Sequence, residues 1–363
     1  MASITIQNLT KRFGNTVAVN DLSLHIEDRE LLVMVGPTGA GKTTTLRCVA
    51  GLEKPDTGTI LFDGVDMAGL SPAARDVAFV FQNYALYPRK TVRENIAFPL
   101  VPRGYSPQQR EAEVRRVAQM LRIDHLLDRR PAQLSGGEQQ RVALGRAMVR
   151  TPHVYLMDEP LTNLDFLLRA QMRTELKRIQ QELNRTFFYV TNDQIEALAM
   201  GDRVAVLNKG VLQQVGPPQE VYDHPANLFV ASFIGSMRMN FLRCTYRTDT
   251  GRLVGSDGLW SVPAPEKLRA VARNGGDPGQ LILGIRPEDI QLVDGGTDDT
   301  FKGEVYVVEP LGDRNIYDVR VGPALIKVKM PPTYLREAGA PVSVRFNMAR
   351  AHLFDARTEQ ALT

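Results

Sequence analysis

Cysteines, unbalanced charge and long apolar runs are all scarce in this chain of 363 residues. Its two cysteines, Cys48 and Cys244, are far apart in the sequence, so nothing indicates a disulfide framework. We expect both to be buried, reduced thiols in a cytosolic protein. No apolar run approaches the roughly 18 residues that span a bilayer as a helix. We therefore expect a soluble chain whose link to a membrane, if it has one, is made through a partner.

The charges nearly balance, with 44 Lys and Arg against 41 Asp and Glu and a net charge of +3. A nucleic acid or an anionic membrane as the main partner normally requires a basic excess. The sequence therefore predicts no nucleic acid among the partners. The alternating start of the chain (Ile4, Ile6, Leu9) indicates an edge strand and not a secretion signal. At this length we expect two or three domains.

A glycine-rich loop after residues 31–35 gives the strongest indication of function. The residues before the loop are all apolar and predict a buried strand. Gly36, Gly41, Lys42 and Thr43 then match the phosphate-binding pattern G-x-x-x-x-G-K-[ST]. Glycines let backbone N–H groups surround phosphates at a helix start, the lysine contacts the β- and γ-phosphates, and the threonine hydroxyl binds Mg²⁺. We predict a nucleotide site formed by Gly36, Pro37, Thr38, Gly39, Ala40, Gly41, Lys42, Thr43 and Thr44.

Two more apolar strands end in polar side chains. Residues 77–81 lead into Gln82, and the carboxyl ends of parallel strands are where α/β sheets bind ligands. Residues 154–157 lead into Asp158 and Glu159. An Asp there holds Mg²⁺ in phosphate-loop ATPases, and the adjacent Glu can act as general base on the attacking water. Two acids at a strand end can also be merely solvated, but the phosphate loop favours the functional interpretation.

Phe13 and Ser135 each allow two interpretations. Phe13 lies between predicted strands over 3–9 and 22–27. It can stack on an adenine ring or fill the core, and this residue alone favours the core. Ser135-Gly136-Gly137 precedes a predicted helix, where a hydroxyl and free N–H groups suit a phosphate. Taken alone, an ordinary N-cap is the simpler explanation.

The pattern of apolar and polar residues differs between the part of the chain before about residue 240 and the part after it. Helices are expected over 42–50, 91–98 and 166–183 and from 106 onward, with strands over 59–62 and 187–191 and a hairpin over 203–215. Beyond about residue 240, short alternating runs separated by Gly, Pro and Asp predict small β-barrels or sandwiches. These runs are 281–285, 303–308, 315–321, 324–329 and 342–346.

In this order and spacing, the motifs resemble those of the ATP-binding subunit of ABC transporters over nearly the whole chain. Residues 36–43 resemble the Walker A loop, Gln82 the Q-loop residue, 134–138 the signature motif, 154–159 Walker B with the catalytic glutamate, and 161–165 the D-loop. Phe13 then corresponds to the aromatic that stacks on adenine, which reverses the preference for the core. The resemblance implies ATP and Mg²⁺ as cofactors, with Thr43, Gln82 and Asp158 at the metal.

The C-terminal half resembles the carbohydrate-importer ATPases of the maltose type. Residues 229–236 and 239–242 match their pattern, and 284–288 and 352–355 resemble hallmarks of their OB-like regulatory (TOBE) domain. The resemblance implies an α/β P-loop NTPase fold, an ABC nucleotide-binding domain over 1–236 with a RecA-like core and a helical subdomain at about 88–150. An all-β OB-fold/TOBE-like regulatory domain over 237–363 would follow.

This resemblance also implies partners and a location. The chain would be a peripheral importer ATPase at the cytoplasmic face of the plasma (inner) membrane. It would meet integral-membrane permease subunits, an extracytoplasmic substrate-binding protein indirectly, and a second ATPase subunit in a homodimer or a mixed dimer. Each of two ATP molecules would lie between one chain's Walker motifs and the other chain's Ser135, Gly136 and Gly137. The solute would be a sugar or related polyol, and residues 84–89 would contact the permease.

Three positions depart from the family pattern. Glu138 replaces the usual Gln of the signature, and Arg89 replaces a His in the loop expected to meet the permease. Asn192 stands where the family has the switch histidine that contacts the γ-phosphate and positions the water with Glu159. An amide neither titrates nor carries charge, so we expect ATP binding to survive and hydrolysis to be slow. One alternative is a weakened subunit of a mixed dimer, and another is a soluble ABC ATPase of DNA repair or translation.

Overall fold

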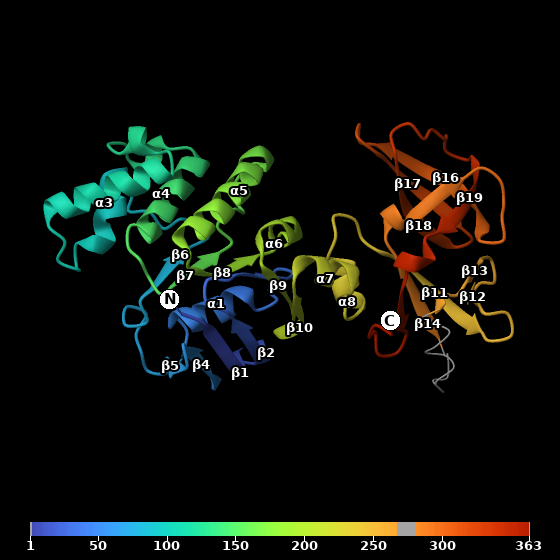
Figure 1. Cartoon of the computed structure of the whole chain (residues 1–363), viewed down its shortest axis with the longest axis horizontal. Helices are drawn as coiled ribbons and strands as arrows, with labels where there is room; N and C mark the ends of the chain where they lie inside the picture. The colour runs from blue at the N-terminus through green and yellow to red at the C-terminus, as the bar shows by residue number, and fades with distance from the viewer. Residues whose placement is uncertain (1, 267–279, 363) are drawn as a thin grey trace. The chain divides into compact units, whose positions relative to one another are not determined.

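The computed structural model describes residues 2–266 and 280–362, which belong to two compact units, Met1–Gln219 and Glu220–Thr363. The first unit has a central sheet of six strands in the order β10-β9-β3-β8-β7-β6 (Figure 1). Its strands pair in parallel except for β10, which runs antiparallel to β9. Their bounds are β3 Leu31–Val35, β6 Val77–Val80, β7 Val154–Asp158, β8 Thr186–Thr191, β9 Arg203–Asn208 and β10 Val211–Gly216.

Every residue of β3, β7 and β8 is buried, because these strands are covered on both faces. The predicted apolar strands and the hairpin over 203–215 are confirmed. Because β3, β6, β7 and β8 are parallel neighbours, their carboxyl ends lie along one edge of the sheet. The phosphate loop, Gln82, Glu159 and Asn192 follow those ends.

A second, antiparallel sheet lies beside α1 (Lys42–Ala50) and has the strand order β2-β1-β4-β5. Its strands are β1 Ile4–Phe13, β2 Thr16–Ile26, β4 Thr57–Phe62 and β5 Val65–Asp66. The first two extend further toward each other than the predicted strands over 3–9 and 22–27. Leu46 and Cys48 of α1 pack in one apolar core with residues from both sheets. The helix that follows the phosphate loop is therefore held between the two sheets, and it ends at Gly51 in the left-handed conformation, as expected.

Three further helices of this unit come from residues 92–148. They are α2 Val92–Ala97, α3 Pro107–Met120 and α4 Gly136–Met148, and α2 packs against both of the others. Thr91 with Glu94 and Ser106 with Gln109 form capping boxes at the starts of α2 and α3. The unit also contains α5 (Phe166–Leu183) and α6 (Gln194–Met200), which pack against each other. Of these helices, α2, α3, α4 and α5 were expected from the pattern of caps and apolar positions.

The second unit is rich in antiparallel strands, as the alternating runs predicted. One five-stranded sheet has the order β13-β12-β11-β14-β20 and the other β15-β19-β16-β17-β18. Trp260, Phe301 and Phe346 lie in their common apolar core. The bounds are β11 Asn240–Arg247, β12 Arg252–Gly255, β13 Ser261–Pro263, β14 Leu281–Ile285, β15 Ile290–Val293, β16 Thr300–Pro310, β17 Asn315–Val321, β18 Ala324–Met330, β19 Pro341–Phe346 and β20 His352–Asp355.

The two units divide earlier in the chain than the expected boundary at residue 236. Two short helices, α7 (Pro218–Asp223) and α8 (Leu228–Phe233), precede the strands. Ala231 of α8 packs with Met239, Ile282 and Phe354 of the second unit. The buried Arg286 donates hydrogen bonds to the carbonyl oxygens of Ile234 (2.8 Å) and Tyr222 (2.7 Å). Because of these contacts, α8 and the end of α7 belong to the β-rich unit.

Both cysteines are buried and free, as expected. Burial raises the pKa of Cys48 to about 11 and that of Cys244 to about 12, so neither is a reactive thiolate near neutral pH. Within the described parts of the chain, no helix has the length and apolarity needed to cross a membrane.

Candidate active site

The phosphate loop of residues 36–41 connects the end of β3 to the start of α1, and two of its glycines have no room for a side chain. A Cβ on Gly36 would overlap the backbone carbonyl of Leu207, and one on Gly41 would overlap that of Ala18. Gly41 also has φ 101°, in the left-handed region that favours glycine. As N-cap of α1 it offers no side-chain hydrogen bond. The N-cap residue therefore supplies no side-chain acceptor to the N–H groups of the first turn of α1, which fits a phosphate at this helix terminus.

Lys42 is held inside this loop, and its side chain is only 4% exposed. Its Nζ donates to the carbonyl oxygens of Gly36 (2.9 Å) and Pro37 (3.0 Å). Burial lowers the pKa of Lys42, while the carboxylates of Glu159 and Asp158 oppose that shift. A buried cation beside uncapped N–H groups matches the donor set that phosphates require.

Thr43 and Asp158 bring two oxygen donors together at the edge of the sheet. The Thr43 hydroxyl donates to Asp158 Oδ1 at 2.7 Å, from the first turn of α1 to the last residue of β7. Burial raises the pKa of Asp158, because the charged form loses solvent there. A hydroxyl and a carboxylate are hard oxygen ligands that suit Mg²⁺. Within residues 2–266 and 280–362 no group of three or more His, Cys, Asp and Glu is placed to hold a metal ion.

Glu159 is the point at which four segments of the chain meet. Its Oε2 accepts hydrogen bonds from the Gln82 amide (3.2 Å), the Asn192 amide (3.3 Å) and the Thr162 hydroxyl (3.3 Å). Its Oε1 lies 3.7 Å from Lys42 Nζ. The carboxylate is therefore fixed in position by groups from the phosphate loop, the Q-loop, the D-loop and the end of β8.

The backbone of Glu159 is also unusual. It has φ 45°, which is rare for a residue with a side chain, and its N–H donates to the Val190 carbonyl (2.9 Å) on the neighbouring strand β8. Strained conformations of this kind are retained mainly at functional sites, where the surrounding contacts enforce them. The strain turns the chain sharply after Asp158, so that the two adjacent acids have different partners.

The structure thus brings together six predicted residues along the carboxyl edge of the sheet. Lys42, Gln82 and Asn192 form a network around Glu159, and Thr43 pairs with Asp158 beside it. Sequence reasoning missed two members of this network, Thr162 and Asn163. The Asn163 amide donates to the Gln82 carbonyl at 3.1 Å. Both residues belong to the D-loop motif over 161–165, but the motif alone does not predict which other loops they contact. The six predicted residues are Lys42, Thr43, Gln82, Asp158, Glu159 and Asn192.

Phe13 is not a core residue, so the preference based on this residue alone was wrong. It is the last residue of β1 and 47% exposed, with Lys11 Nζ 5.0 Å from the centre of its ring. It pairs with Thr16 at the start of β2, two positions before Ala18, whose carbonyl faces Gly41. An exposed aromatic ring therefore lies on the hairpin that borders the phosphate loop, where a base can stack on it.

Ser135 is an N-cap with a full capping box. Its Oγ accepts from the N–H of Glu138, and the Glu138 carboxylate accepts from the Ser135 N–H (2.7 Å) and hydroxyl (2.8 Å). These bonds lower the pKa of Glu138, so the unusual Glu of the signature has a structural role here. A Cβ on Gly136 would lie 3.8 Å from the Asn163 carbonyl. The signature residues 135–138 therefore border the D-loop of the same chain. They make none of the contacts described above for Glu159.

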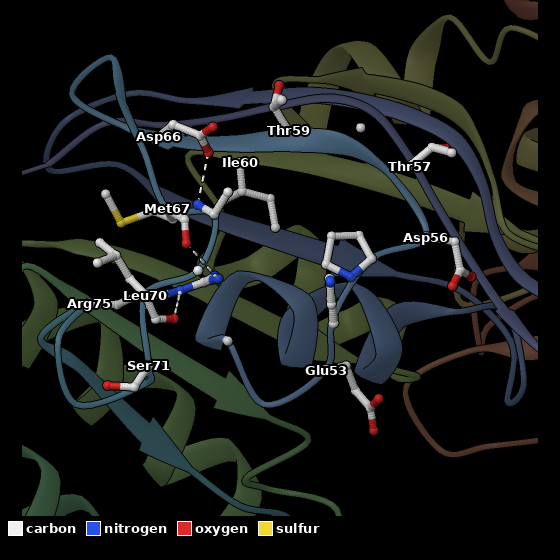
Figure 2. Close-up of a pocket in the computed structure, with 16 residues that line it drawn as sticks. Glu53, Asp56, Thr57, Thr59, Ile60, Asp66, Met67, Leu70, Ser71 and Arg75 are labelled. Carbon is white, nitrogen blue, oxygen red and sulfur yellow. Dashed lines mark hydrogen bonds between the residues drawn. The ribbon is translucent and has the colours of Figure 1, made fainter.

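A pocket of about 590 Å³ lies away from this network, at the C-terminal end of α1 (Figure 2). Arg75 closes one side of it. The Arg75 guanidinium donates to the carbonyls of Cys48 and Val49 at the end of α1 and to those of Met67 and Leu70. This arginine caps the helix and connects it to the segment that enters β6, so its guanidinium has a structural role.

Comparisons with known proteins agree with this geometry. The chain matches the families described as ABC transporter over residues 19–162, MalK OB fold domain over 235–290 and TOBE domain over 283–354. It is 45% identical to the trehalose/maltose import ATP-binding protein of Thermococcus litoralis, over 100% of both chains. It is 48% identical to a xylose/arabinose import ATP-binding protein of Haloferax volcanii, over 100% of this chain and 96% of that one.

A solved structure resembles the first part of the chain. It is a dimeric ATP-binding cassette in a post-hydrolysis state, bound to ADP and phosphate. The two are 30% identical with a TM-score of 0.54, over 59% of this chain and 98% of that one.

Proposed function

The chain belongs to the ATP-binding proteins of ABC transporters, and we propose that it hydrolyses ATP to drive the import of a sugar or a related polyol. The observation that supports hydrolysis best is the convergence of Lys42, Gln82, Thr162 and Asn192 on the carboxylate of Glu159. The full-length likeness to sugar-import ATPases supports the solute class. A soluble ABC ATPase without a transport role is not favoured by these relatives.

ATP would bind at the phosphate loop. The N–H groups of residues 38–44 and Lys42 Nζ would hold the phosphates, and Phe13 would stack on the adenine. Thr43 and Asp158, already in contact at 2.7 Å, would hold Mg²⁺ with Gln82 near it. The metal would neutralise charge on the phosphates. The orientation and activation of the attacking water are assigned to side chains of this chain.

Glu159 would act as general base toward the attacking water. Its carboxylate is oriented by two amides and one hydroxyl, and a general base needs its acceptor atom in a fixed direction. Gln82 and Asn192 would orient the water from either side of Glu159. Asn192 offers one hydrogen bond but no charge, so this step should be slow compared with a site that has histidine at this position. Losing a positioned acid–base group typically costs about 10²–10⁴ in rate.

The site would be completed by a second ATPase subunit. Ser135, Gly136 and Gly137 stand at the N-terminus of α4, outside the Glu159 network of their own chain, and would bind the phosphates held by the partner. The solved relative with ADP and phosphate is a dimer. The intact Lys42, Asp158 and Glu159 favour a homodimer slightly, whereas Asn192 is the observation that favours a mixed dimer with a faster partner.

Three substitutions separate these cases in steady-state ATPase assays of the assembled transporter. In a homodimer, Asn192→His raises the rate and Glu159→Gln abolishes it. In a mixed dimer, Ser135→Arg stops turnover because this chain's signature serves the fast site, while Glu159→Gln costs little. If Asn192→His changes nothing and both other variants are inactive, Asn192 is no defect.

The membrane permease would bind at residues 84–89. Tyr84 and Ala85 both have positive φ, and Arg146 of α4 holds this turn by donating to the carbonyls of Ala85 (2.6 Å) and Tyr84 (2.8 Å). The exposed ring of Tyr87 packs on Phe98 with 4.4 Å between ring centres. An exposed aromatic surface directly after Gln82 would transmit permease movement to the site.

The permease contact is tested by charge reversal. Arg89→Glu should weaken co-purification with the permease and lower uptake, while Lys54→Glu, the same change at an exposed position outside this segment, should leave both unchanged. Full assembly and full uptake by the Arg89 variant would exclude this contact. The chain expressed alone should stay off membranes and sediment with them only beside its permease.

A further inference from the structure

Arg169 lies one helical turn into α5 and has no part in the function proposed above. Its Nη2 donates to the carbonyl oxygens of Thr162 (3.3 Å) and Leu164 (2.9 Å), both in the D-loop. Its Nη1 donates to Asp193 Oδ2 at 3.3 Å, on the segment between β8 and α6. One planar guanidinium therefore joins two loops that are almost thirty positions apart in the sequence, and α5 and α6 carry them side by side (Figure 1).

Each of the two loops also contacts Glu159 directly. The Thr162 hydroxyl and the Asn192 amide both donate to Glu159 Oε2. Arg169 binds the carbonyl of Thr162 itself and the carboxylate of Asp193, the residue next to Asn192. The guanidinium thus binds Thr162 itself and the residue next to Asn192, but it does not contact Glu159.

The loop after β8 is braced from its other side. Thr191 Oγ1 accepts from the Asp193 N–H (3.0 Å) and donates to Glu196 Oε2 (2.7 Å), which also accepts from the Tyr189 hydroxyl (2.8 Å). Asp193 Oδ1 caps α6 through the N–H of Ile195 (2.7 Å). Asp193 therefore uses one oxygen for the helix and the other for Arg169, so its position depends on both.

We propose that Arg169 is a positioning residue for hydrolysis, which ties the D-loop to the segment containing Asn192 so that both hold Glu159 in one orientation. Arginine suits this task because its rigid fork of N–H donors can bind two carbonyls and a carboxylate at once. The inference rests on the proposed role of Glu159 as general base. It adds that a residue which touches neither phosphate loop nor Glu159 controls the rate.

The proposal predicts a change in kcat with little change in ATP affinity. Arg169→Met removes all three hydrogen bonds and keeps a long apolar side chain, and a small displacement of catalytic groups lowers rates by up to about 10²-fold. We expect a fall in kcat of about tenfold or more. The Kd for ATP should stay within about threefold, because Lys42 and the loop of residues 36–44 do not contact Arg169.

Asp193→Asn is the matched change on the other loop. Asparagine is as good an N-cap as aspartate, so α6 keeps its cap while the charge opposite Arg169 is lost. We expect a smaller fall in kcat than for Arg169→Met, since the two D-loop hydrogen bonds remain. In the double variant, Asp193→Asn should add little to Arg169→Met, because its partner is already missing.

The control is Arg178→Met on the same helix. Among the described residues, Arg178 forms ion pairs with Glu175 and Glu182 of α5 and a long hydrogen bond to the Met120 carbonyl. This substitution should leave kcat unchanged. The experiment measures ATPase kinetics, ATP affinity and thermal melting of these variants in the assembled transporter. If Arg169→Met does not fold, Asp193→Asn alone carries the test, with a lowered kcat and unchanged ATP affinity expected.

Three results would overturn the proposal. They are normal kcat in Arg169→Met, a loss of ATP affinity as large as the loss of kcat, and independent, multiplicative effects of the two substitutions. Glu159→Gln is measured in parallel. If it leaves the rate of this chain's site intact, the proposed role of Glu159 fails; if it abolishes hydrolysis while Arg169→Met is neutral, only the inference about Arg169 fails.

Discussion

Replacing Lys42 by Met separates binding of nucleotide from stability of the fold. The side chain keeps its length but loses its charge and its hydrogen bonds to the Gly36 and Pro37 carbonyls. Two unit charges about 4 Å apart interact by about 4 kcal/mol at an effective dielectric constant of about 20. At about 1.4 kcal/mol per factor of ten, that corresponds to roughly a thousandfold in affinity. Solvent and salt screen part of this interaction, so we expect a loss of about a hundredfold or more.

The melting temperature should respond much less than the affinity. The substitution removes two hydrogen bonds and the 3.7 Å ion pair with Glu159, but it also removes the cost of burying a charge, the same cost that lowers the pKa of Lys42. These effects oppose each other, so we expect a shift of about 5 °C or less.

Calorimetric titration with ATP and Mg²⁺ measures the affinity of the Lys42 variant. Lys177→Met is the matched control, because Lys177 pairs with Asp202 at the surface of the same unit (2.6 Å). It should bind ATP like the parent. An affinity of the Lys42 variant within about threefold of the parent would refute the assignment of this loop to the phosphates.

Further predictions concern three other side chains of the site. Asp158→Asn should abolish Mg²⁺-dependent hydrolysis yet raise the melting temperature of the nucleotide-free protein, because burial raises the pKa of Asp158 and so disfavours its charged form in the fold. That penalty is present above the folded-state pKa and disappears as the pH falls through it, so the gain in stability should shrink toward acid pH; a gain independent of pH would contradict the argument. Phe13→Ala should weaken ATP binding about tenfold through lost stacking, while a variant with Leu at this position should be intermediate, and unchanged affinity would remove Phe13 from the site. Asn192→His should raise the ATPase rate of a homodimer at least tenfold, as measured by phosphate release, and no change would show that Gln82 and Glu159 suffice.

Much of the site was predictable because its residues follow apolar strands that are easy to recognise. Residues 31–35, 77–81 and 154–157 are apolar runs of strand length, and the polar residues after them lie at one sheet edge because the strands are parallel. The helix starts at Thr91 and Ser106 were predictable from local capping patterns. In each case the information lies within a few residues.

The parts that could not be predicted depend on which loops meet in space. The position of Phe13 was ambiguous because a single aromatic at the end of a strand does not reveal which side is covered. The contacts of Asn163 with Gln82 and of Arg169 with Asp193 join segments distant in the sequence, and no local pattern specifies them. The division of the compact units near residue 219 depends on how α8 packs against β-strands far along the chain, which no local pattern specifies.

If hydrolysis at this chain's site drives import, the assembled transporter should accumulate solute inside vesicles. The chain is assembled with its permease and binding protein, and uptake of labelled candidate sugars and polyols is measured with ATP inside the vesicles, for the parent and for Glu159→Gln. The parent should accumulate at least one of these solutes in an ATP-dependent manner. In a homodimer the Glu159 variant should bind ATP but accumulate nothing. Accumulation that needs no ATP, or a parent complex that hydrolyses ATP without moving any of these solutes, would contradict this coupling of hydrolysis to import.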